Sequence, residues 1–187
     1  GSGRSILLDV DADDDAWLKS LTSKHRYYVR KARNAALDWR YGNGASEIAA
    51  MAQLSRQLAK DKATTVGLFS QDDLECLSTL LRDHCRILVG YEHEQPVSAC
   101  TVFHVGALAY YASAATVGRG RELSAAYAMM LELRKRLRED GVTHFDFGGI
   151  APENSAARGV DHFKLGFNGK VVEYLGEWET ASSLPHR

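Results

Sequence analysis

The stretch from residue 144 to residue 167, HFDFGGIAPENSAARGVDHFKLGF, contains a single lysine and two adjacent glycines. Its first residues read as a strand that ends on Gly148-Gly149, and Lys164 follows in a compact segment beyond a loop. A preorganised cation can stabilise an oxyanion that develops in a transition state. We therefore predict that Lys164 is catalytic, and the alternative is a solvent-facing lysine without a partner.

The two glycines and the preceding acid could serve the same chemistry. Glycine tolerates a positive φ and lets a ligand approach backbone amides closely, so Gly148 and Gly149 are predicted to bind substrate. A tight strand-to-loop turn would explain them equally well. Asp146 lies on the strand face opposite Phe145 and Phe147, and its carboxylate could orient a substrate amine or accept its proton. Transfer could also proceed without a protein base if the substrate carries the proton.

Aromatic residues complete the predicted substrate site. Phe163 and Phe167 lie four residues apart, which would anchor their segment in the core and leave Lys164 on a different face. Phe163 and, in an upstream strand, Tyr111 are assigned to substrate binding. The three cysteines lack a C-x-x-C spacing, so no metal site is expected.

The segment from residue 19 to residue 40 is strongly basic, with Asp38 as its single acid. On a helix its cations form a stripe that could neutralise phosphates of a nucleic acid. A solvated helix surface is the alternative. The candidate binding residues are Lys24, Arg26, Arg30, Lys31 and Arg33.

Length and composition limit the function classes. A chain of 187 residues fits one domain with a sizeable core. The formal net charge of −1 gives no global attraction to nucleic acid or anionic membrane, so such binding requires a local patch. No apolar run approaches the roughly 18 residues of a membrane span. The odd number of cysteines favours reduced thiols in the cytoplasm.

The elements that must position these residues follow from the apolar pattern. Helical periodicity predicts helices at 11–21, 23–37, 45–62, 70–84 and 121–140, besides a short one around Lys164. Alternation predicts strands at 4–10, 38–44, 85–92, 96–105, 107–116, 143–148 and 170–179. A three-stranded meander followed by a helical crossover indicates an α/β fold, with a mixed, mostly antiparallel sheet flanked by helices.

Three motifs, FDFGGI, HFKLGFNG and VVEYLGEWE, together resemble the C-terminal half of the Fem (FemABX) family. The upstream LTSKHRYYVRKARNAAL is similar to the basic helix that opens the same half, and the similarity spans residues 5–179. Members of this family add amino acids to peptidoglycan precursors and take them from aminoacyl-tRNA. The resemblance implies a GNAT-like acyltransferase fold, tRNA contacts by the basic helix, and a role for Lys164 at the tetrahedral intermediate or the tRNA end.

The activity that the resemblance implies is an aminoacyltransferase that forms an amide bond. Aminoacyl-tRNA would be a co-substrate and no cofactor is expected. The amine acceptor would be a peptide, a peptidoglycan precursor or a small molecule. Many relatives place an arginine after the helix that corresponds to 45–62, where it holds precursor phosphates. Residues 60–73 contain no arginine, which argues against a diphosphate-bearing acceptor.

Family members usually carry two tandem GNAT-like domains, and this sequence shows only the second. Residues 4–180 are expected to form a single GNAT-like domain, with 1–3 as an expression remnant and 181–187 as a tail. Either an N-terminal domain is missing or the chain is a single-domain relative. Two copies could also pair as a homodimer that imitates the tandem arrangement.

Two other functions stay open at this point. An acyl-CoA-dependent GNAT N-acyltransferase would hold pyrophosphate in a Gly-rich loop before the long helix. Gly118 and Gly120 in TVGRGRELSAAYA match such a loop only partly, because Glu122 is unfavourable beside phosphates. A non-catalytic GNAT-like module would bind tRNA without turnover.

Overall fold

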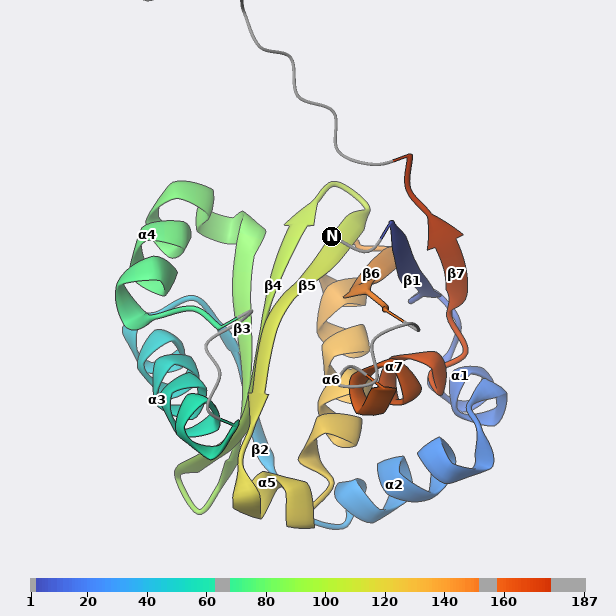
Figure 1. Cartoon of the computed structure of the whole chain (residues 1–187), viewed down its shortest axis with the longest axis horizontal. Coiled ribbons are helices and arrows are strands. Elements are labelled where there is room, and N and C mark those ends of the chain that lie inside the picture. Colours follow the sequence, from blue (N-terminus) through green and yellow to red (C-terminus); the bar gives the residue numbers. More distant parts are fainter. Residues whose placement is uncertain (1–2, 63–67, 152–157, 176–187) are drawn as a thin grey trace, which may run out of the picture.

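The computed structural model describes residues 3–62, 68–151 and 158–175. Within these ranges the strands form a seven-stranded sheet with the order β2-β3-β4-β5-β6-β1-β7 (Figure 1). The strands are β1 (Arg4–Asp9), β2 (Asp38–Gly42), β3 (Cys85–Glu92), β4 (Gln95–Val105), β5 (Leu108–Thr116), β6 (His144–Gly149) and β7 (Lys170–Glu173). Neighbouring strands are antiparallel except β5 and β6. The predicted α/β class with a mixed, mostly antiparallel sheet is confirmed.

The parallel pair β5–β6 is short. Residues 108–110 pair with residues 144–146, although both strands continue beyond these positions. The carboxyl ends of the two strands therefore part. In α/β sheets, ligands bind beyond the carboxyl ends of strands, and the Gly148-Gly149 pair lies at this end of β6.

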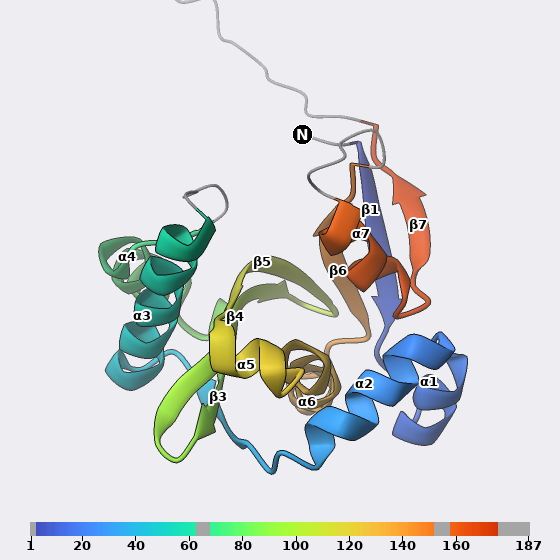
Figure 2. The same ribbon diagram turned by 60° about the horizontal axis from the view of Figure 1, so that its bottom comes forward.

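The helices lie on both faces of the sheet (Figures 1 and 2). They are α1 (Asp14–Ser20), α2 (Ser23–Arg33), α3 (Ala45–Lys62), α4 (Gln71–Leu81), α5 (Gly118–Glu122), α6 (Ala125–Glu139) and α7 (Arg158–Leu165), with a 3₁₀ turn at Arg82–His84. One face packs against α3 and α4, and the other packs against α1, α2, α6 and α7. Among the described helices, none combines the length and the apolar character that a bilayer crossing requires.

The helix boundaries agree with their sequence signals in most places. The predicted helix 45–62 is α3, and Ser70 caps α4 in a capping box with Asp73. The predicted helix 121–140 is instead two helices, because Ser124 adopts a left-handed backbone with φ 59° between α5 and α6. The last strand ends at Glu173, and residues 176–179 of the prediction lie outside the described residues.

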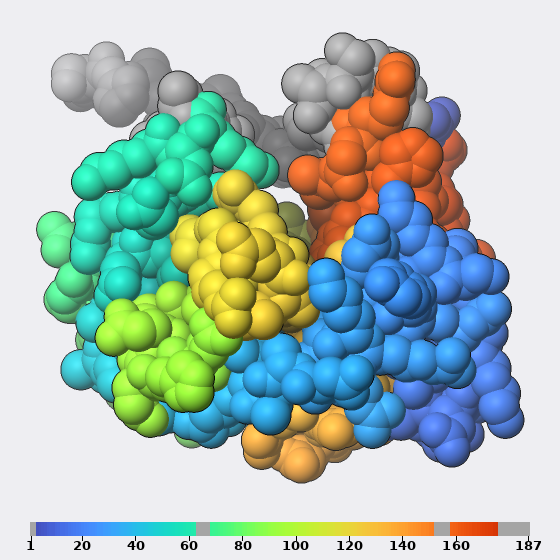
Figure 3. All heavy atoms as spheres, turned by 90° about the horizontal axis from the view of Figure 1, so that it is seen from below, coloured from blue at the N-terminus to red at the C-terminus, as the bar shows by residue number. Residues whose placement is uncertain are grey.

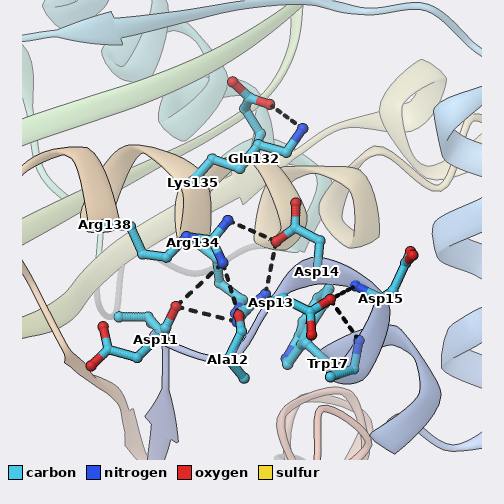
Figure 4. Close-up of polar contacts among 12 residues, drawn as sticks. Asp11, Ala12, Asp13, Asp14, Asp15, Trp17, Glu132, Arg134, Lys135 and Arg138 are labelled. Carbon is cyan, nitrogen blue, oxygen red and sulfur yellow. Dashed lines mark hydrogen bonds and ion pairs between the residues drawn. The ribbon is translucent and has the colours of Figure 1, made fainter.

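A buried arginine on α6 holds the segment that leads into α1 (Figure 4). Arg134 is 0% exposed, and its Nη2 donates to the carbonyls of Ala12 at 2.7 Å and Val10 at 3.3 Å. Its Nη1 donates to Asp14 Oδ1 at 3.3 Å, and its guanidinium lies 4.4 Å from the Trp17 ring centroid. Burial lowers the pKa of Arg134 to about 10, so the side chain stays protonated at neutral pH. We call Arg134 and these four partners the α6 clasp.

Candidate active site

The side chain of Lys164 points back from α7 to the end of β6. Its Nζ donates to the carbonyl oxygen of Gly149 at 2.8 Å and lies 5.8 Å from the ring centroid of Phe147. The side chain is half-buried. Burial lowers the pKa of Lys164, while the carboxylates of Asp161 and Asp146 act in the opposite direction. The predicted proximity of this lysine to the glycine pair is therefore present in the structure.

Gly148 occupies a position that favours glycine for two reasons. Its φ is +79°, in the left-handed region where a side chain is strained. An added Cβ would also lie 3.4 Å from Lys164 Nζ and 3.5 Å from the carbonyl oxygen of Tyr111. The turn interpretation therefore accounts for Gly148, and the same turn presents the Gly149 carbonyl to the lysine. A direct substrate contact by either glycine stays a prediction.

Asp146 is buried and already bonded to the protein. Its Oδ1 accepts from the Ser5 hydroxyl and from the Gly148 amide at 2.8 Å, and its Oδ2 accepts from the Tyr174 hydroxyl at 2.5 Å. The hydrogen bond to Asp146 raises the pKa of Tyr174 to about 12. This carboxylate therefore joins β1, β6 and the residue after β7. Its bond to the Gly148 amide also stabilises the turn at Gly148. A role as the base for a substrate amine stays a prediction.

The two predicted aromatic contacts belong to a cluster beneath Lys164. Phe163 and Phe167 pack edge to face with ring centroids 5.0 Å apart, and Phe147 lies 5.7 Å from Phe167. Phe167 is 1% exposed, so the expected anchoring of this segment is observed. Tyr111 packs edge to face on Phe147 at 5.0 Å, and burial raises its pKa. Substrate binding by Phe163 and Tyr111 stays a prediction.

Two adjoining cavities lie between α2, α5 and α7. The larger, of about 510 Å³, extends along α7 beside His25 and Gly166, and the smaller, of about 350 Å³, extends to Arg121 beside α5. Both are lined by Lys24, Tyr127 and Phe163. Figure 3 shows the surface hollowed between these elements. Lys164 lines neither cavity, whereas the preceding residue, Phe163, lines both.

The basic residues of α2 divide into two groups. Arg26 Nη1 donates to the carbonyls of Lys19 at 2.8 Å and Leu21 at 2.6 Å, so this side chain closes the end of α1. The other candidate cations, Lys24, Arg30, Lys31 and Arg33, are exposed. Arg26 thus has a structural role at the end of α1, which its position among the predicted nucleic-acid-binding cations did not indicate. Contact of these residues with nucleic acid stays a prediction.

The partial match to a coenzyme A loop has a structural explanation. A Cβ on Gly120 would lie 2.2 Å from the carbonyl oxygen of Val97, so the packing of α5 on β4 requires glycine there. Arg119 donates to both oxygens of Glu92, at 2.7 and 2.6 Å, and to Glu122 at 3.0 Å. Gly120 and Arg119 are therefore accounted for without a phosphate.

His25 and Tyr127 are site residues that the sequence analysis did not select. The ring of His25 contacts Tyr127, with centroids 5.1 Å apart, and both side chains line the larger cavity. A signal was present, because His25, Val29 and Ala32 follow i, i+4, i+7 spacing and are the buried positions of α2. Tyr127 lies near the start of a helix whose boundary was misplaced.

Comparison with known proteins adds the family. Residues 69–184, more than half of the chain, match the sequence profile of the FemAB family. The chain belongs to the FemAB family. Aminoacyltransferase FemA of Staphylococcus aureus is 24% identical over 111 residues, which are 58% of this chain and 26% of FemA. The chain therefore matches about a quarter of the length of these curated FemAB relatives.

Solved structures agree with the fold of this FemAB chain. The crystal structure of FemX superposes with a TM-score of 0.82 at 15% identity, over 93% of this chain and 60% of FemX. The C-terminal domain of a lysylphosphatidylglycerol synthetase from Agrobacterium fabrum gives 0.64 at 16% identity, over 90% and 57%. An aminoglycoside acetyltransferase from a soil metagenome gives 0.52 at 14% identity, over 81% and 96%. The predicted GNAT-like fold is confirmed.

Proposed function

We propose that this chain transfers an aminoacyl group from aminoacyl-tRNA to an amine and forms an amide bond. Membership of the FemAB family supports aminoacyl transfer. The observation that carries the proposal is the placement of Lys164, whose ammonium is half-buried and hydrogen-bonded to the Gly149 carbonyl beside the parted ends of β5 and β6. An ammonium in partly dehydrated surroundings stabilises nearby negative charge more strongly than one in water.

The reaction balances without an added cofactor. The acceptor amine attacks the carbonyl carbon of the aminoacyl ester, a C–N bond forms, and the carbonyl oxygen becomes an oxyanion. When the tetrahedral intermediate collapses, the C–O bond to the tRNA ribose breaks and the proton lost by the amine ends on the ribose oxygen. Lys164 would stabilise the oxyanion, and aminoacyl-tRNA serves as a co-substrate.

The two cavities suit the nucleic acid end of such a substrate. Lys24 lines both cavities, and Arg121 lines the smaller one. Tyr28 and Tyr127 add aromatic surface, with ring centroids 4.9 Å apart. Cations that contact phosphates, together with aromatic faces that stack on bases, are the usual elements of single-stranded nucleic acid binding. The amine acceptor would be a peptide, a peptidoglycan precursor or a small molecule.

The first experiment measures transfer and the role of Lys164 together. The purified chain is incubated with radiolabelled aminoacyl-tRNAs and amine acceptors, and the label in amide products is followed. We expect Lys164→Met, which keeps the side-chain length and removes the charge, to lower kcat by about 10- to 1,000-fold. Lys170→Met, an exposed lysine on β7, is the matched control and should not change kcat.

The same experiment separates the other functions. Unchanged kcat in Lys164→Met would remove this lysine from the mechanism. A non-catalytic module would protect charged tRNA from hydrolysis without consuming it. Tight binding of coenzyme A in calorimetry, together with transfer from acyl-CoA, would favour an acyl-CoA-dependent enzyme. A second copy of the chain or a further GNAT-like domain is a proposed partner, and addition of such a domain would then raise the transfer rate.

A further inference from the structure

The end of α7 leaves one carbonyl oxygen to a side chain from another helix. The last four carbonyls of an α-helix have no partner within the helix and need other donors. Three of these carbonyls accept from backbone amides of the residues that follow α7. They are the carbonyls of His162, Lys164 and Leu165. The fourth, the carbonyl of Phe163, accepts from His25 Nε2 of α2 at 2.9 Å.

His25 is held tightly enough to act as a fixed donor. It is 5% exposed, and its Nδ1 lies 2.9 Å from the Thr22 hydroxyl. Because Nε2 faces a carbonyl, Nε2 carries the hydrogen and Nδ1 accepts from the hydroxyl. The ring packs edge to face on Phe167 at 4.8 Å, and a Cβ on Gly166 would lie 1.9 Å from its Cε1. The imidazole therefore fills a space that only glycine at 166 leaves open.

The bonded carbonyl belongs to the residue directly before Lys164. A second contact joins the same two helices, because the Thr22 amide donates to the Gly166 carbonyl at 3.3 Å. These bonds fix the last turn of α7 relative to α2, and the lysine side chain extends from that turn to the Gly149 carbonyl at 2.8 Å. A displacement of this turn would move Nζ by a similar amount. Misplacement of a reacting group by about 1 Å can cost up to about 100-fold in rate.

Resting on the proposed function, we propose that His25 is a positioning residue, whose hydrogen bond to the Phe163 carbonyl seats Lys164 against the end of β6. The same bond joins α2, which carries the exposed cations, to α7, which carries Lys164. His25 does not touch the reacting atoms in this role. His25 contributes one hydrogen bond, from Nε2 to the Phe163 carbonyl. The phenylalanines of the cluster contribute only packing.

Two substitutions of similar size separate donation from packing. In His25→Gln the amide Nε2 stands near the position of the imidazole Nε2 and can donate to the Phe163 carbonyl. In His25→Met the side chain has a similar length and volume and cannot donate. Gly166→Ala gives a third variant, in which the donor is kept and an added methyl group displaces the ring.

The test measures the titration of Lys164 itself, by NMR of the ¹³Cε nuclei in lysine-labelled protein, with the signal assigned through Lys164→Arg. We expect wild type and His25→Gln to titrate below the ordinary lysine pKa of 10.5, because Lys164 stays seated. His25→Met and Gly166→Ala should titrate closer to 10.5. Equal Lys164 titration in all four proteins, or a His25→Gln that behaves like His25→Met, would overturn the proposal.

The transfer assay then separates the two proposals. With aminoacyl-tRNA as substrate, His25→Met should lower kcat by up to about 100-fold with KM little changed, and His25→Gln should restore kcat. An expected NMR result without any transfer in wild type would leave the positioning role intact and contradict the proposed function. Normal transfer in His25→Met, with Lys164 displaced, would contradict the positioning role in catalysis.

Discussion

Lys164 differs from an ordinary surface lysine in its surroundings. Its ammonium has lost part of its hydration, lies near the Phe147 ring and donates to the Gly149 carbonyl. Burial destabilises the charged form, and the two nearby carboxylates, Asp161 and Asp146, only partly compensate, so the pKa of Lys164 is lowered. The Lys164 ammonium thus loses its proton more readily than an ordinary lysine fully exposed to water.

The lowered pKa predicts a pH dependence for transfer. If the ammonium stabilises the oxyanion, kcat falls as the pH rises through the lowered pKa, so the alkaline limb lies below the ordinary value of 10.5. Asp161→Asn removes a charge that raises the pKa and should move this limb to lower pH. A pH–kcat profile from pH 6 to about 11 would measure the position of the alkaline limb in wild type and in Asp161→Asn. An alkaline limb that persists in Lys164→Met would contradict the assignment to Lys164.

Sequence patterns predicted some of these residues and not others, for a physical reason. The approach of Lys164 to the glycines was predictable because only 15 residues separate Lys164 from Gly149, and a loop followed by a short helix can fold back within that length. The partners of Asp146 were not, because Ser5 is 141 residues away. The spacing of His25 with Val29 and Ala32 indicated that His25 is buried. Its hydrogen bond to the Phe163 carbonyl was not predictable, because Phe163 is 138 residues away.

At the scale of elements, the α6 clasp determines where α1 begins. Arg138, one turn after Arg134, donates to the Ala12 carbonyl at 2.9 Å and to Asp14 Oδ1 at 2.8 Å. Two adjacent guanidinium groups therefore converge on one loop, and burial of the first is compensated by carbonyls, a carboxylate and the Trp17 ring. Trp17 in turn stacks on Phe167, at 5.9 Å, which connects the clasp to the aromatic cluster below Lys164.

The clasp predicts unequal effects of two arginines on the same helix. Arg134→Ala should lower the free energy of unfolding by about 3 kcal/mol or more, because it leaves a cavity and buried carbonyls with fewer donors. Arg136→Ala, which removes more exposed pairs with Glu132 and Glu139, should cost less than about 1 kcal/mol. Urea unfolding monitored by circular dichroism measures both. Similar losses for the two variants would show that the clasp adds little stability.

The accuracy of the predicted elements followed the strength of their local signals. The stripe of Ile48, Met51 and Leu54 defines α3, and Ser70 marks the start of α4. The break between α5 and α6 rests on a left-handed Ser124, and serine gives no sequence signal for that conformation.

For the whole molecule, the near-zero net charge conceals an uneven distribution. Of the exposed cations of α2, Lys24 lines both cavities, whereas the formal charge of the chain is −1. With so small a net charge, attraction to a polyanion requires a local patch, and the exposed cations of α2 offer one. Such attraction releases counterions and weakens as salt rises.

This distribution predicts a position-dependent effect of charge reversal. Arg30→Glu with Arg33→Glu should weaken tRNA binding and flatten the dependence of log Kd on log salt, because fewer phosphates are neutralised. Arg56→Glu, an exposed arginine on α3 across the sheet, reverses charge elsewhere and should have little effect. Filter binding from 50 to 200 mM salt compares them, a range over which about four phosphate contacts change affinity by about 10²-fold. Equal slopes for all variants would show that the α2 stripe is only solvated surface.

The place of β1 between β6 and β7 has a consequence for how the molecule is made. A ribosome completes β1 long before it synthesises the two strands that flank it. Until then β1 has two open edges, and open edges invite pairing with strands of other nascent chains. The half of the sheet formed by β6, β1 and β7, against which Lys164 lies, is thus completed last. Slow translation of the residues that form β6 and β7 would prolong the interval in which a chaperone has to shield β1.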